Sequence, residues 1–189
     1  MDHKKYIHSQ AKRFSGENHQ AQGRLKQAFK FFKPIVKSDK PLLDIGSRDG
    51  WFIEFLERKR YKDVQGIEIT KNAVAHAQSK GRNVTWGDAH DLSRFIDEQF
   101  TTVLMIHSLE HCHNPDIVID SVYRILQPGG VFFIEVPLED DPDEDVAHFC
   151  SFASVHDVVK KLGDRFELLK HKVSPFCEAK HLLCGFRKK

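Results

Sequence analysis

The chain has 189 residues, the length of a single domain that buries most of its apolar surface in one core. Hydrophobic residues make up 40% of the sequence and charged residues 30%, as in ordinary globular proteins, and the net charge is +2. No apolar run approaches the roughly 20 residues that span a bilayer, and the first residues lack the apolar segment of a secretory signal. We therefore expect a cytoplasmic protein with no transmembrane segment. Its four cysteines are expected to be buried or free thiols and not a disulfide framework.

The charges are distributed unevenly along the chain. Residues 1–40 carry ten Lys and Arg against three acids, and residues 160–189 carry nine against three, so the middle is acidic. Basic ends can contact nucleic acid or an anionic lipid surface. Because aromatic residues are not interleaved with the basic ones as a stacking platform needs, we expect solvated faces of terminal elements and no nucleic-acid partner. The oligomeric state is left open.

The first predicted element is an amphipathic helix over residues 24–37. Its apolar side chains fall on one stripe, and Pro34 weakens its last turns. With the basic residues before it, this helix forms a basic N-terminal segment, residues 1–38, ahead of a main domain over residues 39–189. We expect the segment to act as a lid over the functional site, because lids exclude water in many enzymes.

Strand and helix patterns alternate in the next part of the chain. Short apolar runs predict strands at residues 41–46, 63–69, 83–87, 101–107 and 131–136. Amphipathic runs between them predict helices that open at Gly50, cover residues 71–81, and run from Pro115 to a Pro-Gly-Gly turn. Such alternation implies parallel strands joined by right-handed crossovers.

The pattern changes beyond the acidic residues 139–145. A helix is predicted over residues 152–163, and two strand patterns follow at 166–173 and 179–186. These two lie too close together for another helical crossover, so they should pair as an antiparallel hairpin at the sheet edge. The predicted fold class is therefore α/β, with a Rossmann-like, mostly parallel seven-stranded sheet, a C-terminal antiparallel hairpin, and helices on both faces.

Acidic residues close three successive predicted strands. Asp44, Glu68 and Asp88 lie 24 and 20 residues apart, one strand–helix unit each. In an open α/β sheet, ligands bind beyond the carboxyl ends of the strands. A buried acid is costly unless something pairs with it. Three acids at one rim therefore favour a ligand rich in donors: hydroxyls, an amine or a cation.

Several motifs resemble those of the class I S-adenosylmethionine-dependent methyltransferases. Residues 44–50, DIGSRDG, are similar to the first motif, acid-x-Gly-x-Gly-x-Gly, with Arg48 in place of the middle glycine. Residues 66–70, GIEIT, resemble the second motif, and residues 87–92, GDAHDL, the third. MIHSLEHCHNP, followed by ILQPGGVFFIEVP, is similar to the fourth and fifth motifs of the branch that methylates small molecules, including quinone precursors. The resemblance extends over residues 40–187.

This resemblance implies S-adenosyl-L-methionine as the cofactor and a small-molecule acceptor. Glu68 would accept both ribose hydroxyls, Asp88 would lie near the adenine amino group, and Ala89 would offer its backbone. Asp44 either contacts the cofactor or braces the loop, and the Arg48 guanidinium either grips a carboxylate or points into water. The cofactor-binding residues implied in this way are Asp44, Gly46, Ser47, Gly50, Glu68, Ile69, Asp88, Ala89 and His107.

The glycine spacing argues against a dinucleotide cofactor. A dinucleotide site needs Gly-x-Gly-x-x-Gly, so that the pyrophosphate can approach the helix N-terminus. Counted from Gly46, the second and third glycine positions hold Arg48 and Trp51. S-adenosylmethionine has no phosphate; its methionine end needs a bare backbone at Gly46, and acids complement its ammonium group and ribose.

Catalysis would depend mainly on alignment, because the sulfonium of the cofactor is already an electrophile. A hydroxyl acceptor would also need a base of near-neutral pKa, and we expect His111 or His148 to supply it. We assign no metal ligands, although Glu110 and His111 leave open a divalent ion that orients the substrate. The sequence H-x-x-E-H at residues 107–111 matches the inverted zinc-protease motif, but that motif requires one helix and His107 ends a predicted strand.

Three other functions compete with methyl transfer to a small molecule. A protein that binds S-adenosylmethionine without transferring its methyl group would keep Gly46 and Glu68 but lack an acceptor pocket. A zinc hydrolase would use residues 107–111. A nucleic-acid methyltransferase would carry Asn-Pro-Pro-aromatic or Pro-Cys after the fourth strand, and HSLEHCHNP offers neither.

Overall fold

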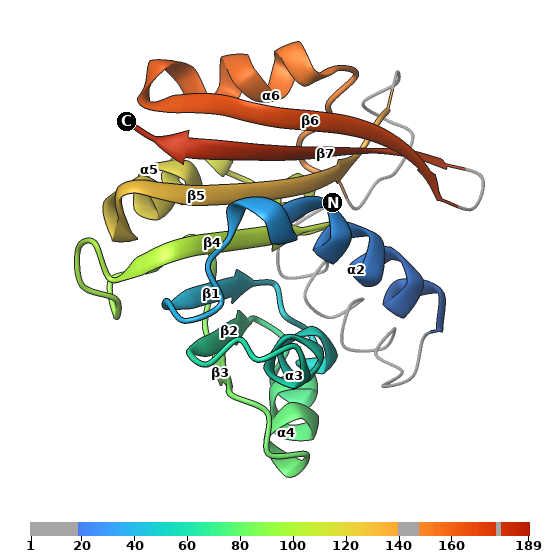
Figure 1. Cartoon of the computed structure of the whole chain (residues 1–189), viewed down its shortest axis with the longest axis vertical. Coiled ribbons are helices and arrows are strands. Elements are labelled where there is room, and N and C mark those ends of the chain that lie inside the picture. The colour runs from blue at the N-terminus through green and yellow to red at the C-terminus, as the bar shows by residue number, and fades with distance from the viewer. Residues whose placement is uncertain (1–18, 140–147, 177–178) are drawn as a thin grey trace.

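The computed structural model describes residues 19–139, 148–176 and 179–189, which build one seven-stranded sheet with helices packed on both faces (Figure 1). The strand order is β3-β2-β1-β4-β5-β7-β6. The first five strands pair in parallel, and β7 pairs antiparallel with both β5 and β6, so the predicted fold class is confirmed. The strands are β1 Leu42–Ile45, β2 Val64–Glu68, β3 Val84–Trp86, β4 Phe100–Ile106, β5 Leu126–Pro137, β6 Phe166–Phe176 and β7 Ala179–Lys188.

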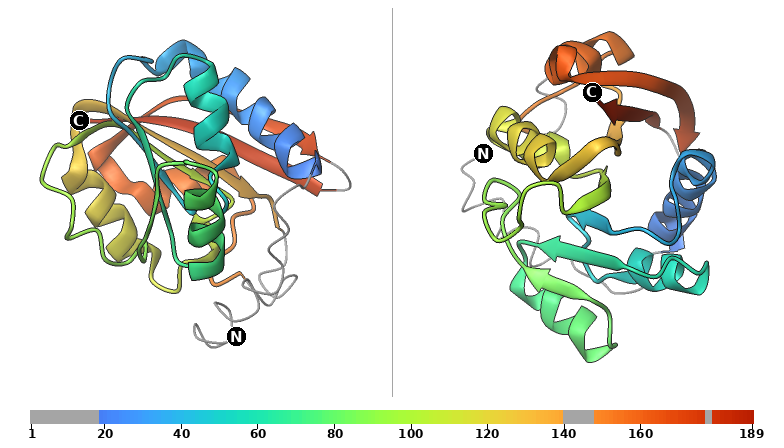
Figure 2. Two further views of the ribbon diagram at one scale, coloured as in Figure 1. Left: turned by 90° about the horizontal axis from the view of Figure 1, so that it is seen from below. Right: turned by 60° about the vertical axis from the view of Figure 1, so that its left-hand side comes forward.

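Alternate residues of the central strands face two separate cores. Leu42, Leu104 and Phe133 pack with α2, α3 and α4, whereas their sequence neighbours Leu43 and Val103 pack with α5 and α6. This alternation is the two-residue period of a β-strand covered on both faces. The right-hand view of Figure 2 shows α5 and α6 on one side of the twisted sheet and α2 and α3 on the other. The helices are α2 His19–Phe32, α3 Trp51–Arg58, α4 Lys71–Ser79, α5 Pro115–Ile125 and α6 Val155–Leu162.

Helix α2 ends earlier than the hydrophobic stripe predicts. It stops at Phe32, and a 3-10 turn over Lys33–Ile35 follows. Pro34 explains the change, because it has no N–H for the next helical hydrogen bond. The helix belongs to the core, since the Phe32 side chain is fully buried and its ring lies 5.4 Å from that of Phe133. The rest of the predicted lid, residues 1–18, lies outside the described residues, so the lid stays a prediction.

Helix α6 begins three residues later than expected. Ser154 caps it: its hydroxyl accepts from the Asp157 N–H, and the Asp157 carboxylate accepts from the Ser154 N–H. Such a capping box satisfies the first free N–H groups of a helix and so fixes where it begins. The acid of the box is an aspartate, so the Ser-x-x-Glu pattern would not have found it.

Strand β5 is longer at its start than predicted. The Pro-Gly-Gly turn lies within it, because Phe100 pairs with Leu126 and Thr102 already pairs with Val131. The residues between form a bulge in which Gly129 has a φ of 73°. The predicted turn at Pro-Gly-Gly is therefore present, but β5 pairs with β4 both before and after this turn.

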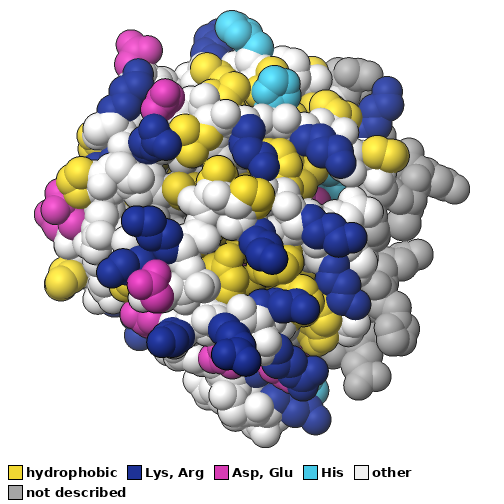
Figure 3. Space-filling model, in the orientation of Figure 1, with side chains coloured by type: hydrophobic (Ala, Val, Ile, Leu, Met, Phe, Trp, Pro, Cys, Tyr) yellow, Lys and Arg dark blue, Asp and Glu magenta, His cyan; other side chains and the backbone are white. Residues whose placement is uncertain are grey.

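The surface over α2 is basic. Figure 3 shows Lys and Arg side chains spread across the face that carries α2, with fewer acidic side chains among them. This matches the excess of positive charge in the first 40 residues of the sequence. Among the described residues, no helix is both long and apolar enough to cross a bilayer.

The burial of Phe32 predicts that α2 is a structural part of the fold. We expect Phe32→Ala to lower the free energy of unfolding by about 3–5 kcal/mol, because it removes a buried aromatic ring and leaves a cavity. The exposed neighbour provides the control, since Lys33→Ala should change stability by about 0.5 kcal/mol or less. Urea denaturation would measure both, and a loss below about 1 kcal/mol for Phe32→Ala would show that α2 detaches from the sheet.

Candidate active site

A pocket of about 800 Å³, counting its open mouth, lies at the carboxyl ends of β1, β2 and β4. The strand order reverses between β1 and β4, and this switch point is where open α/β sheets bind ligands. Seven of the predicted site residues line the pocket, namely Gly46, Glu68, Ile69, Asp88, Ala89, His107 and His111. The other four, Asp44, Ser47, Gly50 and His148, are not among its lining residues.

The first glycine after β1 keeps the floor of the pocket open. Gly46 has a φ of 82°, which side-chain-bearing residues rarely adopt, and a Cβ there would lie 2.7 Å from the Cβ of Ser108. Its N–H and that of Ser47 both donate to the carbonyl of Ile67, which ties the loop to β2. Only glycine satisfies both the backbone conformation and the close approach of the loop after β4.

The other two predicted loop residues serve packing beneath the pocket. The Ser47 hydroxyl donates to the Ile67 carbonyl at 3.3 Å and lies against Gly66. A Cβ on Gly50 would lie 2.7 Å from Val84 and 3.1 Å from Arg82. Position 50 therefore needs a glycine, because the start of α3 packs closely against β3 there. Neither Ser47 nor Gly50 is among the residues that line the cavity.

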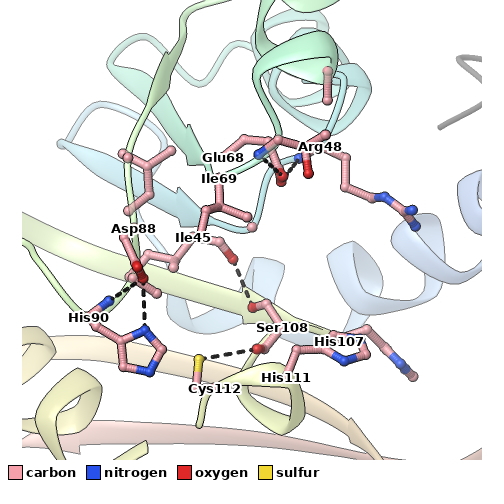
Figure 4. Close-up of a pocket in the computed structure, with 16 residues that line it drawn as sticks. Ile45, Arg48, Glu68, Ile69, Asp88, His90, His107, Ser108, His111 and Cys112 are labelled. Atoms are coloured by element: carbon pink, nitrogen blue, oxygen red, sulfur yellow. Dashed lines mark hydrogen bonds and ion pairs between the residues drawn. The ribbon is translucent and has the colours of Figure 1, made fainter. Parts of the chain in front are cut away.

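Arg48 occupies the position of the missing middle glycine and keeps a glycine-like backbone. Its φ is 50°, a left-handed conformation that costs a side-chain-bearing residue roughly 1–2 kcal/mol. Its backbone N–H donates to Glu68 Oε2 at 3.0 Å, and this hydrogen bond stabilises the left-handed conformation. The side chain is exposed, and Figure 4 shows the guanidinium extending away from Asp88 and His90.

Glu68 is held by the loops on either side of it. Its Oε2 accepts from the Arg48 N–H, and its Oε1 accepts from the Thr70 N–H at 2.8 Å. The side chain is only 7% exposed, yet it lines the pocket. Because each carboxylate oxygen has two lone pairs, both oxygens keep capacity to accept from a ligand. Glu68 therefore offers a ligand two hydrogen-bond acceptors in fixed positions.

Asp88 is paired with His90, a pocket residue that the sequence analysis missed. Asp88 Oδ1 accepts from the His90 N–H at 2.9 Å and lies 2.7 Å from His90 Nδ1. The other ring nitrogen, Nε2, accepts from the Asn114 N–H at 3.3 Å. An acceptor at Nε2 requires the proton on Nδ1, so neutral His90 donates to Asp88 and orients its carboxylate.

Asp44 lies in the sheet beneath the pocket. It is 4% exposed, in the middle of β1 between Gly66 of β2 and Leu104 of β4. Burial, and then the nearby Glu68 carboxylate, raise the pKa of Asp44 to about 7. Between the two alternatives left by the sequence, its burial favours a role behind the loop.

His107 links the pocket to a buried network of acids and histidines. It has a φ of 52°, and its N–H donates to the Glu135 carbonyl at 2.8 Å. Its Nδ1 lies 3.2 Å from Glu110 Oε1, and its Nε2 lies 3.0 Å from His181 Nδ1. Burial lowers the pKa of His107, but the contacts with Glu110 and Glu135 outweigh it and raise the pKa above its usual value. Burial raises the pKa of Glu110, but the contact with His107 has the larger effect and lowers this pKa to about 2.

The two predicted catalytic histidines lie together. The ring centroids of His111 and His148 are 4.9 Å apart, and His148 Nδ1 lies 2.5 Å from Glu139 Oε1. His111 is in the 3-10 turn Leu109–His111 and lines the pocket. His107 follows β4 and belongs to a different cluster, whereas His111 lies in the 3-10 turn, so the histidines of H-x-x-E-H do not share one helix as the zinc-protease motif requires.

Thr70, His90, Ser108 and Cys112 also line the pocket, and none of them was among the predicted site residues. Thr70 and His90 stand inside the second and third motifs, so reading every residue of each motif would have included them. Ser108 follows β4 and its hydroxyl donates to the Ile45 carbonyl at 2.8 Å, a contact visible in Figure 4. Cys112 reaches the pocket only because the 3-10 turn carries it there, and no sequence pattern predicts that.

The pKa of Asp44 predicts a pH-dependent stability. A carboxyl whose pKa is about 7 when folded and 3.8 when unfolded binds more protons in the folded state between these values, so stability falls as pH rises through this range. Asp44→Asn removes this effect. Its stability relative to the wild type should therefore rise by about 4 kcal/mol between pH 4 and pH 7 and stay level above that.

Denaturant unfolding of both proteins at several pH values measures this difference. Asp63→Asn, at an exposed position before β2, is the matched control and should keep the pH dependence of the wild type. A constant difference between Asp44→Asn and wild type from pH 5 to pH 8 would contradict the raised pKa.

The family model described as "Methyltransferase domain" matches residues 18–180 of this chain. The ubiquinone biosynthesis O-methyltransferase of Pseudomonas entomophila (strain L48) is 35% identical over 106 residues, which cover 52% of this chain and 45% of that protein. The mitochondrial ubiquinone biosynthesis O-methyltransferase of Dictyostelium discoideum is 31% identical over 108 residues, covering 49% of this chain and 34% of that protein. The chain therefore spans less than half the length of these curated relatives.

Solved structures share the fold. A chain of the complex between the Haloferax volcanii Trm112 methyltransferase activator and a methyltransferase matches with a TM-score of 0.81 and 16% identity, covering 97% of this chain and 96% of that one. An S-adenosylmethionine-dependent methyltransferase from Methanosarcina mazei matches with a TM-score of 0.72 and 22% identity, covering 84% and 96%. Because the family model covers most of the chain and agrees with the motifs, the chain belongs to the methyltransferase domain family, whose implied cofactor is S-adenosyl-L-methionine.

Proposed function

We propose that this protein transfers a methyl group from S-adenosyl-L-methionine to a small-molecule acceptor, and that the acceptor atom is a hydroxyl oxygen. The single observation that carries the proposal is the pocket at the switch point, where the Glu68 carboxylate is fixed opposite the bare backbone of Gly46. Family membership supports the same reaction class.

The lining of the pocket fits the cofactor in charge and shape. Glu68 offers two oriented acceptors to a pair of vicinal hydroxyls, which a ribose carries. Asp88, held by His90, offers an acceptor to an amino group, and the apolar side chains of Ile67 and Ile69 suit the faces of an adenine ring. Two carboxylates also favour a ligand that carries positive charge.

The remaining predicted cofactor residues support the loop from below. Gly46 leaves space for the amino-acid end of the ligand. Ser47 and Gly50 pack against neighbouring strands, Asp44 is buried in β1, and none of these three is among the residues that line the cavity. His107 closes the pocket at the end of β4. When bound, the cofactor supplies an electrophilic methyl group on a sulfonium centre. The protein then has to hold the acceptor in line with that methyl group and remove a proton from it.

His111 and His148 are suited to remove the acceptor proton. His111 lines the pocket, and the contact between His148 Nδ1 and Glu139 Oε1 orients the His148 ring beside it. A basic pair at this rim supports a hydroxyl acceptor, whose proton must leave on methylation. The names of the relatives, ubiquinone biosynthesis O-methyltransferases, point to the same class of acceptor.

A protein that binds the cofactor without transferring its methyl group is the second candidate. The two are separated by titrating the chain with S-adenosyl-L-methionine and then measuring S-adenosylhomocysteine formation with phenols, catechols and amines. Binding followed by turnover on a hydroxyl compound supports the proposal. Saturable binding with no turnover on any acceptor class would favour the binding protein, and turnover only on amines would refute the oxygen acceptor.

Glu68 should carry much of the affinity for the cofactor. We expect Glu68→Gln to weaken binding of S-adenosyl-L-methionine by about 10- to 150-fold, because it replaces charge-assisted hydrogen bonds worth about 1.5–3 kcal/mol. Glu57→Gln, at an exposed site on α3, should bind as the wild type does. Isothermal titration calorimetry measures the affinities, and circular dichroism melting checks the fold. Unchanged affinity in folded Glu68→Gln would rule out its role.

The acid–base role of His111 predicts a loss in turnover and not in cofactor binding. His111→Ala should lower kcat by about 10²–10⁴-fold and abolish the acidic limb of the pH–rate profile, because no group then accepts the proton. His156→Ala, at an exposed position on α6, should leave both unchanged. If His111→Ala keeps the acidic limb with the same midpoint, another group is the base, and the same experiment on His148→Ala decides whether it is His148.

A further inference from the structure

We propose that His107, Glu135 and His181 form a binding site for one divalent transition-metal ion, with zinc as the best fit. Their donor atoms all lie within 4.8 Å of one another. The three residues come from three strands, since His107 follows β4, Glu135 lies within β5, and His181 lies on β7 opposite Pro137 of β5. The sequence gives no hint of this grouping, because the hairpin brings His181 back from the end of the chain.

The distances between the donor atoms match one face of a tetrahedral metal site. His107 Nε2 lies 3.0 Å from His181 Nδ1 and 3.5 Å from Glu135 Oε1, and His181 Nδ1 lies 3.3 Å from Glu135 Oε1. Ligands at about 2.0–2.1 Å from a tetrahedral zinc ion are about 3.3 Å apart. Two imidazoles and one carboxylate are also a ligand set that zinc uses, with a fourth position left open.

The other ring nitrogen of His107 lies beside a carboxylate, the usual partner of a metal-binding histidine, although the two do not form a hydrogen bond in the described residues. His107 Nδ1 lies 3.2 Å from Oε1 of Glu110, which is fully buried. Metal-binding histidines almost always donate their second N–H to such a carboxylate, which fixes the tautomer and orients the ring. With its proton on Nδ1, His107 presents a lone pair at Nε2, the atom that faces His181 and Glu135.

Burial of the cluster calls for a compensating positive charge. Side-chain exposure is 2% for Glu135, 7% for His181 and 14% for His107. Glu135 Oε2 is buried and makes no hydrogen bond to any residue in the described part of the chain. Arg24 Nε lies 3.9 Å from Glu135 Oε1, at the outer limit of an ion pair. A cation bound at the centre of the triangle would stabilise the buried Glu135 carboxylate in place of a proton on the two imidazole rings.

The position of the site suggests what the ion does. His107 also lines the cofactor pocket, so the ion would lie directly beside that pocket. Its open fourth position can take a water molecule or an oxygen atom of the acceptor. This role in orienting an acceptor oxygen rests on the proposed function, whereas the metal site itself does not.

A neighbouring cluster must be distinguished from this one. Glu110, His111 and His148 also have donor atoms within 4.8 Å of one another. There His148 is already in close contact with Glu139, and Glu110 faces His107. We therefore place the ion at the first cluster, with Glu110 as its outer partner.

The test measures metal binding in the absence of cofactor and acceptor, so its failure is separate from a failure of the proposed function. The untagged 189-residue chain is stripped of metal with a chelator. It is then titrated with Zn²⁺ by competition with a chromogenic chelator, and with Co²⁺ by absorption spectroscopy. We expect one ion per chain and the intense visible bands of four-coordinate Co²⁺. No stoichiometric binding of either ion would overturn the proposal.

Variants then locate the ion. Glu135→Gln and His181→Ala should abolish stoichiometric binding, and Glu110→Gln should weaken it by about 10- to 100-fold by releasing His107. His148→Ala should bind as the wild type does. Binding that survives in folded His181→Ala but is lost in His148→Ala would place the ion at the neighbouring cluster and refute the proposal.

A second measurement covers the case in which these buried variants fail to fold. X-ray absorption of the zinc-loaded wild type should show two imidazole ligands and oxygen ligands at about 2.0–2.1 Å. Fewer than two imidazoles, thiolate ligands at about 2.3 Å, or the loss of an imidazole ligand in zinc-loaded His148→Ala would overturn the assignment.

Discussion

The site depends on one interaction: the Glu68 carboxylate accepts hydrogen bonds from two backbone N–H groups. Arg48 donates from the loop after β1, and Thr70 donates from the loop after β2. A buried carboxylate would be costly without such donors. The shared acceptor adds to the hydrogen bonds from Gly46 and Ser47 to Ile67 that already tie the loop after β1 to β2. The same carboxylate therefore fixes the shape of the pocket and presents lone pairs to the ligand. Gly46 completes this arrangement, because its backbone lets the loop after β4 approach.

The strand order explains why these groups meet. Adjacent parallel strands end at the same edge, and β1 lies between β2 and β4, so three loops converge where the order reverses. Two side-chain-bearing residues at this edge, Arg48 and His107, adopt left-handed backbone conformations. A strained backbone conformation persists only where surrounding contacts hold it in place. Here the Arg48 N–H donates to Glu68 and the His107 N–H donates to the Glu135 carbonyl. The pocket is thus built from backbone geometry as much as from side chains.

Much of the fold was predictable, because strand and helix periods are local. The seven strands and the closing hairpin follow from short apolar runs and their spacing, and Glu68 and Gly46 follow from the motifs. What the sequence could not predict depends on long-range contacts. Ser47 and Gly50 belong to the motif, yet they pack beneath the pocket, since their neighbours come from other strands. His181 joins His107 only through the return of β7 beside β5.

The most direct test of the central claim is a nuclear magnetic resonance titration that follows the backbone amides of Arg48 and Thr70 while S-adenosyl-L-methionine is added. If the ligand shares the carboxylate with these two donors, both amide resonances should shift along one saturable curve, with the same dissociation constant. Saturable binding that moves other amides and leaves these two unmoved would place the ligand elsewhere and contradict the account.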